Sequence, residues 1–137
     1  MNDWIEIDSD AISQNQAKWL IIDESTFILA QFREVLKPMG LHFFEARDVV
    51  SAIELINCHE DIDVIICDVN LMRMNGAALV QSLPRKAQKQ TPIYLLSAES
   101  KVDLVADAQK FGAAGWISKP PKSADLAALL NNWGHPK

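Results

Sequence analysis

The stretch "DVIICDVN", residues 63–70, places four consecutive apolar residues directly before a carboxylate, Asp68. An apolar run of this length is typical of a strand that is buried on both faces of a sheet. A second run, "WLIIDE" at residues 19–24, ends in the same way on Asp23 and Glu24. Two buried strands that both stop at carboxylates suggest that the acids share one site at a sheet edge.

Short apolar runs and longer helical patterns alternate along the whole chain. Strands are predicted at Trp19–Ile22, Leu41–Phe44, Val64–Cys67, Ile93–Leu96 and Gly115–Ile117. Apolar residues at helical spacing predict helices within 27–36, 49–56, 77–83, 101–111 and 124–133. This alternation favours a single α/β domain, in which helices cover both faces of a five-stranded parallel sheet through right-handed crossovers.

Local chemistry indicates where several of these elements begin and end. Gly40 and Gly112 are suited to end helices, because glycine adopts the left-handed conformation without strain. Pro92 can open a strand, since it lacks the N–H that a strand interior needs. Ser123 can cap the last helix with its hydroxyl oxygen.

Composition excludes several classes of function. The 137 residues suffice for one domain with its own core. The net charge is −5, and four acids fall in residues 1–17, which contain no Lys or Arg, so the remainder is close to neutral. It lacks the clustered basic residues that direct nucleic-acid binding needs. No apolar run exceeds five residues, so we expect neither a signal peptide nor a membrane span.

Cysteine and histidine usage argues against a zinc site or a disulfide framework. Cys58 and Cys67 form no C-x-x-C motif, and His42, His59 and His135 lack ligand spacing. Free cysteines of this kind are typical of a reducing compartment, so we expect the protein to be cytoplasmic.

The ends of the chain differ in composition from the predicted domain at 18–133. Residues 1–17 are acidic and polar and are expected to form a flexible tail, and residues 134–137 are expected to form a C-terminal tail. Trp4, Ile5 and Ile7 leave open an alternative in which the first segment docks on the domain or on a partner.

Polar side chains follow four of the five predicted strands. Asp23 and Glu24 follow the first strand, Asp68 ends the third, Ser97 follows the fourth and Lys119 follows the fifth. In an open parallel sheet the ligand site lies beyond the carboxyl ends of the strands. Each residue alone is compatible with a solvated loop, but together they favour one site.

These residues resemble those of a known family, the receiver domains of two-component response regulators. The resemblance covers about residues 18–133 and rests on "IIDES", "IICDVN", "LLSAES" and "GWISKP" in the family's order and spacing. It implies a flavodoxin-like (βα)5 fold with strand order 2-1-3-4-5. Within the family, "GAAGWISKP" and "TPIYLLSAES" look most like stand-alone chemotaxis-type receivers.

The resemblance implies a phosphoryl-transfer role for the residues at the strand ends. Asp68 would accept the phosphoryl group, Lys119 would pair with a phosphoryl oxygen, and Ser97 would be the switch hydroxyl. Asp23 and Glu24, with Asp68, would hold Mg²⁺, for which an all-oxygen ligand set is well suited. A weakly nucleophilic carboxylate can accept a phosphoryl group when charge on the transferred oxygens is neutralised.

Further positions match the family less uniformly. By resemblance, Asn70 would add a backbone carbonyl to the metal site and, with Glu99, tune dephosphorylation. Trp116 stands where the family usually has the Tyr or Phe of its switch, and the Lys119–Pro120 peptide is expected to be cis. The segment "VNLMRMNG" at 69–76 is predicted as a loop, with Met72 in place of the usual proline.

The family resemblance implies partners that the sequence itself does not identify. A histidine kinase or phosphotransfer protein would donate the phosphoryl group. The signal would leave through the face made by the fourth helix, the fifth strand and the last helix, on a monomer that binds a downstream protein. This is signalling chemistry with self-dephosphorylation, not metabolic catalysis.

Three alternatives remain at this point. A degenerate receiver would bind a partner without phosphorylation. A haloacid-dehalogenase-type phosphatase would need a second aspartate at Asn70, and a flavodoxin-like electron carrier would need a glycine in the loop "DESTF".

Overall fold

The computed structural model describes residues 18–59, 61–83, 91–99 and 101–133. The strands are β1 (Lys18–Ile22), β2 (His42–Ala46), β3 (Val64–Asp68), β4 (Ile93–Ser97) and β5 (Gly115–Ser118). The helices are α2 (Thr26–Leu36), the 3-10 turn η1 (Lys37–Met39), α3 (Val49–Cys58), α4 (Val69–Gln81), α5 (Lys101–Phe111) and α6 (Ser123–Trp133). The predicted tails, 1–17 and 134–137, lie outside the described residues.

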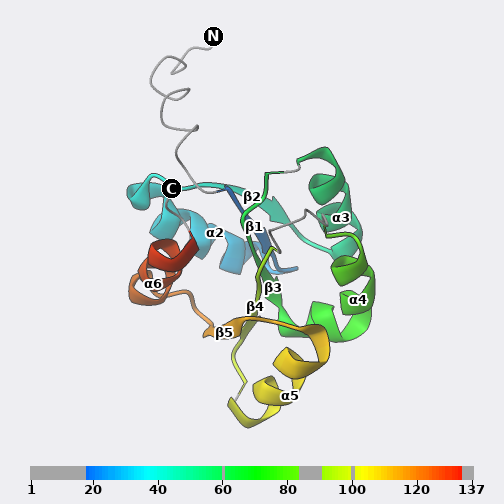
Figure 1. Ribbon diagram of the computed structural model, residues 1–137. Helices are drawn as coiled ribbons and strands as arrows, with labels where there is room; N and C mark the ends of the chain where they lie inside the picture. The colour runs from blue at the N-terminus through cyan, green and yellow to red at the C-terminus, as the bar shows by residue number, and fades with distance from the viewer. Residues whose placement is uncertain (1–17, 60, 84–90, 100, 134–137) are drawn as a thin grey trace.

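The five strands form one parallel sheet in the order β2-β1-β3-β4-β5, which confirms the predicted fold (Figure 1). Its register pairs Ile22 at the end of β1 with Cys67 of β3, and Ser97 at the end of β4 with Ser118 of β5. Because all strands run in one direction, their carboxyl ends meet at the same edge. The loops after β1, β3, β4 and β5 are therefore neighbours.

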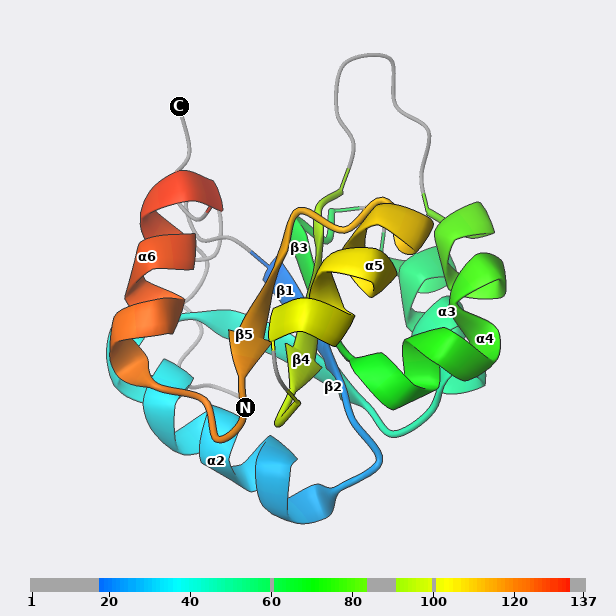
Figure 2. The same cartoon turned by 90° about the horizontal axis from the view of Figure 1, so that it is seen from below.

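Helices cover both faces of the sheet, with α2 and α6 on one side and α3, α4 and α5 on the other (Figures 1 and 2). Alternate strand residues feed these two layers: Leu20 and Ile22 of β1 pack under α3 and α4, whereas Trp19 and Ile21 face α2 and α6. The three central strands β1, β3 and β4 are mostly apolar because both of their faces are buried. None of the helices in the described segments is long and apolar enough for a bilayer crossing.

The boundary residues behave largely as their chemistry predicts. Gly40 and Gly112 have φ angles of 71° and 67°, the left-handed conformation that glycine tolerates best. Pro92 directly precedes β4, and Ser123 is the first residue of α6 rather than the residue before it.

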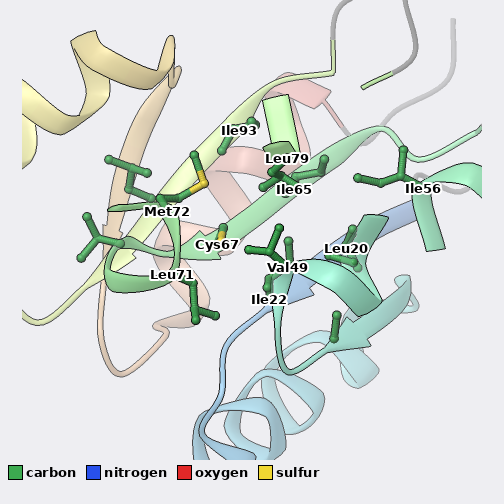
Figure 3. Close-up of a cluster of buried hydrophobic side chains, with 14 of the residues drawn as sticks. Leu20, Ile22, Val49, Ile56, Ile65, Cys67, Leu71, Met72, Leu79 and Ile93 are labelled. Atoms are coloured by element: carbon green, nitrogen blue, oxygen red, sulfur yellow. The ribbon is translucent and has the colours of Figure 1, made fainter. Parts of the chain in front are cut away.

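The segment after Asp68 differs from the prediction, because α4 begins at Val69 and replaces the expected loop over 69–76. The Asp68 carboxylate caps this helix by accepting the backbone N–H groups of Asn70 and Leu71. Met72 is fully buried in the core between α4 and β3 (Figure 3). Only Asn75, with φ −136° and ψ 20°, departs from helical geometry, and the helix is kinked at this residue.

Gly76 allows α4 to lie close to α5. A Cβ at this position would lie 2.7 Å from Phe111 Cε1 and 2.9 Å from Phe111 Cδ1, closer than such atoms approach, and 3.0 Å from Met72 Cε. Overpacking of this kind costs about 1–3 kcal/mol, against about 0.5–1 kcal/mol gained from alanine's helix propensity. We expect Gly76→Ala to lower the free energy of unfolding by about 1 kcal/mol in urea denaturation. Adding the substitution Phe111→Leu to Gly76→Ala should recover part of this loss. A Gly76→Ala variant that is more stable than wild type would contradict the close packing.

Candidate functional site

Asp68 is fixed at the carboxyl end of β3 by contacts to both of its carboxylate oxygens. Oδ2 accepts the backbone N–H groups of Asn70 at 3.0 Å and Leu71 at 3.2 Å. Oδ1 accepts a hydrogen bond from Lys119 Nζ at 2.6 Å. This contact fixes the direction of Oδ1. Because the residue is only 4% exposed, little water can reach the carboxylate. Its position at the start of α4 also favours a negative charge.

Asp23 at the end of β1 supplies a second buried carboxylate. Its Oδ1 accepts the N–H of Ser25 at 2.8 Å, and its own N–H donates to the Ala46 carbonyl at 3.0 Å. Oδ2 lies 2.8 Å from Lys119 Nζ in an ion pair, yet no described residue donates a hydrogen bond of normal geometry to it. The contact of this oxygen with the described residues is therefore the ion pair with Lys119.

Lys119 follows the edge strand β5 and contacts both acids. Its ammonium lies within ion-pair distance of both carboxylates, and its N–H donates to the Ser97 carbonyl at 3.0 Å. Partial burial works to lower the pKa of Lys119, but contacts with Asp23 and Asp68 outweigh it, so the pKa is raised. The Lys119–Pro120 peptide is cis, as the sequence predicts.

Ser97 lies at the end of β4 and is 2% exposed. Its hydroxyl oxygen accepts the backbone N–H of Glu99 at 2.8 Å, which ties the hydroxyl to the loop that follows. Any movement of this hydroxyl toward Asp68 would therefore release a loop contact.

The remaining predicted residues surround this centre. Glu24 and Asn70 are exposed, and the Glu24 carbonyl accepts hydrogen bonds from Nε and Nη2 of Arg47, both at 3.3 Å. The Glu99 carboxylate accepts the guanidinium of Arg73 at 2.9 and 3.0 Å. Trp116 is half-buried against the core that α3, α4 and α5 share.

Arg73 was not among the residues that sequence analysis selected. It stands three positions after Asn70, the spacing at which side chains meet on one side of a helix. This signal requires a helix at 69–76, where a loop is predicted, so the error in secondary structure concealed the contact.

Cys67 directly precedes Asp68 but is unsuited to act as a nucleophile. Burial is the main cause that raises the pKa of its thiol, and the charges of Asp68 and Asp23 raise it further. The protonated thiol behaves as a small core residue, as predicted.

The chemistry of the two carboxylates suits a hard divalent cation such as Mg²⁺. Both offer oxygen, and buried Asp23 Oδ2 lacks a hydrogen-bond donor among the described residues. The ammonium of Lys119 also demonstrates that a positive charge is accommodated between them. Within the described part of the chain, no three His, Cys, Asp or Glu side chains are already gathered as a metal site. The predicted third carboxylate, Glu24, is exposed.

The arrangement of polar residues at the carboxyl ends of the strands agrees with the protein family that the sequence matches. The family model described as "Response regulator receiver domain" matches residues 19–131. The chain belongs to this family. The matched span of the receiver domain includes the four strand ends that carry Asp23, Asp68, Ser97 and Lys119.

Receivers similar to this one include chemotaxis proteins. The chain is 27% identical over 124 residues to Chemotaxis protein CheY-3 of Vibrio cholerae, covering 89% of this chain and 95% of CheY-3. The solved structure of CheY4 of Vibrio cholerae is 31% identical with a TM-score of 0.70, covering 85% of this chain and 97% of that one. The Glycerol metabolism activator of Pseudomonas putida is 34% identical over 115 residues, 82% of this chain but 52% of that protein. The predicted likeness to chemotaxis receivers is confirmed.

Proposed function

We propose that this receiver domain is a phosphorylation-dependent signalling switch whose phosphoacceptor is Asp68. The observation that carries the proposal is the 2.6 Å contact between Asp68 Oδ1 and Lys119 Nζ at the carboxyl edge of the sheet. A buried carboxylate with a cation beside one oxygen can attack a phosphoryl group while the developing negative charge is compensated.

The donor in this proposal is a phosphohistidine of a histidine kinase or phosphotransfer protein. Asp68 Oδ1 attacks phosphorus, the P–N bond breaks, and the imidazole leaves with the electron pair and takes up a proton. The two backbone N–H groups on Oδ2 keep the carboxylate oriented during the attack. Lys119, released from Asp23, is then positioned to pair with a phosphoryl oxygen.

Mg²⁺ would be held by the carboxylates of Asp23, Glu24 and Asp68 and by the backbone carbonyl of Asn70. When bound, it supplies neutralisation of the negative charge that gathers around Asp68. Asp23 Oδ2 supports this assignment, because it is buried and accepts no hydrogen bond of normal geometry from the described residues.

Hydrolysis of the acyl phosphate resets the switch, at a rate to which the side chains of Asn70 and Glu99 contribute. Ser97 and Trp116 carry the change to the face made by α5, β5 and α6, where a downstream protein binds. We propose that the switch acts in the cytoplasm as a monomer, with residues 18–133 as the working domain.

Intact-mass spectrometry after incubation with acetyl phosphate tests this function. We expect one phosphoryl adduct on the wild-type chain with Mg²⁺, none after chelation of the metal, and none on Asp68→Asn. The control Asp125→Asn removes an exposed carboxylate of α6 and should keep the adduct. A wild-type chain that gains no adduct would favour the phosphorylation-independent interaction module instead.

A further inference from the structure

Arg73 on α4 joins three segments around the rim of the site. Its Nε and Nη2 donate to Asp107 of α5 at distances of 2.6 to 3.2 Å. Its Nη1 and Nη2 donate to the two carboxylate oxygens of Glu99 at 3.0 and 2.9 Å. Nη1 also lies 3.5 Å from Asn70 Oδ1. Both views place α4 beside α5, so one guanidinium spans this boundary (Figures 1 and 2).

Glu99, which Arg73 binds, is also hydrogen-bonded to the buried hydroxyl of Ser97. The backbone N–H of Glu99 donates to Ser97 Oγ at 2.8 Å, while its side chain is bound by Arg73. A hydroxyl that turns toward a phosphoryl group on Asp68 must give up this N–H. The loop can follow easily only if the Glu99 side chain is free to move.

We propose that Arg73 is a positioning residue that holds Glu99, and through it Ser97, in the conformation of the unphosphorylated domain. The proposal rests on the function proposed above and adds a restraint that opposes the switch. Arg73 does not touch the reacting atoms; it sets how readily the loop after β4 is released.

The geometry makes this network stronger than an ordinary surface ion pair. Isolated exposed pairs contribute little, partly because both long side chains must be immobilised. Here Asp107, whose side chain is 14% exposed, already fixes the guanidinium, so the pair with Glu99 loses less conformational freedom. Without Arg73, the carboxylates of Glu99 and Asp107 would also repel each other.

Hydrogen exchange in metal-free protein tests the restraint without any phosphorylation. In Arg73→Gln we expect the Glu99 amide to exchange about fivefold faster, equivalent to about 1 kcal/mol of lost local stability. The matched control is Arg33→Gln, which removes a comparable exposed pair of Arg33 with Glu45, at 2.5 and 3.0 Å, on α2 and β2. The control should leave exchange at Glu99 unchanged.

Titration with beryllofluoride and Mg²⁺ tests the effect on the switch. Arg73→Gln should bind this phosphoryl mimic with an apparent Kd about fivefold lower, because more of the protein populates the competent conformer. Arg73→Lys keeps the charge but loses the planar fork, and should fall between the two. In a Glu99→Gln background, Arg73→Gln should add less than twofold, since its restraint acts through that carboxylate.

The outcomes separate this inference from the proposed function. Wild-type protein that binds beryllofluoride, with Arg73→Gln equal to it in both measurements, overturns the role of Arg73 alone. A variant that only melts lower, with unchanged Kd and unchanged exchange at Glu99, also overturns it, since Arg73 would then be merely structural. A wild type that binds no beryllofluoride contradicts the proposed function, whereas exchange at Glu99 still decides whether Arg73 holds the loop.

Discussion

Lys119→Met is expected to lower the free energy of unfolding by about 3–5 kcal/mol near pH 7, the usual loss when one partner of a buried ion pair is removed. The ammonium is the cation that faces both Asp23 and Asp68, at 2.8 and 2.6 Å. The side chains of those acids are 1% and 6% exposed, so water can replace little of the lost interaction. Urea denaturation of the metal-free protein measures the change.

Two matched variants separate charge from packing. Lys119→Arg keeps the positive charge and should lose markedly less stability than the methionine variant. Lys122→Met replaces an exposed lysine nearby and should change stability by less than about 0.5 kcal/mol. If Lys119→Met were as stable as Lys122→Met, the two buried acids would not depend on the ammonium.

The pH dependence of this difference has a definite sign. Because the pKa of Lys119 is raised in the folded state, its charge stabilises the fold fully below the unfolded pKa of about 10.5. That contribution is lost as the pH rises through the folded pKa. The stability gap between wild type and Lys119→Met should therefore be constant from about pH 7 to about pH 9 and shrink above about pH 10. A gap that widens at high pH would contradict the raised pKa.

Mg²⁺ should partly replace the missing ammonium. With no lysine between the carboxylates of Asp23 and Asp68, a given Mg²⁺ concentration should raise the melting temperature of Lys119→Met more than that of wild type. A thermal melt with and without the metal measures this. An equal response in both proteins would place the metal away from Lys119.

The strand ends were predictable because their chemistry is local. An apolar run that ends at Asp68, and a second that ends at Asp23, identify both a buried strand and its carboxyl end. Parallel topology then brings those ends together without any knowledge of side-chain contacts. The order of the strands came from the family resemblance, since periodicity alone does not fix it.

Contacts between distant side chains were less accessible to sequence analysis. The role of Lys119 as the cation between the two acids depends on their separation across β1, β3 and β5, which no spacing along the chain encodes. The helix at 69–76 was missed because a loop after Asp68 was expected there together with the family pattern. The helix depends instead on burial of Met72 and on capping by Asp68, which the residues at 69–76 do not reveal by themselves.

Ser97→Ala is expected to remain a phosphoryl acceptor at Asp68 but to lose the response to phosphorylation. The substitution leaves Asp23, Asp68 and Lys119 in place, so the adduct should still form, although more slowly. It removes the hydroxyl that can turn toward the phosphoryl group. A bias of about 3 kcal/mol changes the ratio of two conformers by more than a hundredfold, so the loss of one charge-assisted hydrogen bond is enough for this expected effect.

Trp116 gives an optical reading of that response. Its indole is half-buried beside the α5 layer and pairs in register with Leu95, two residues before Ser97. Beryllofluoride with Mg²⁺ should change the tryptophan fluorescence of wild type and leave that of Ser97→Ala nearly constant. Trp116→Phe is the necessary control, because the fully buried Trp19 emits from β1, the strand that ends at Asp23.

The variants Ser97→Ala and Trp116→Phe together test whether Ser97 and Trp116 form one pathway. The fluorescence change of wild type should be absent in Ser97→Ala, which lacks the trigger, and in Trp116→Phe, which lacks the reporter. A signal that survives in Trp116→Phe would come from another tryptophan, and a full signal in Ser97→Ala would exclude the hydroxyl as the trigger. Ser97→Ala also removes the acceptor for the Glu99 N–H, so its loop should exchange faster even without phosphate. Faster exchange in Ser97→Ala, without a change in Trp116 fluorescence, would mean that release of the loop is insufficient. The hydroxyl must then also bind the phosphoryl oxygen to move the face made by α5, β5 and α6.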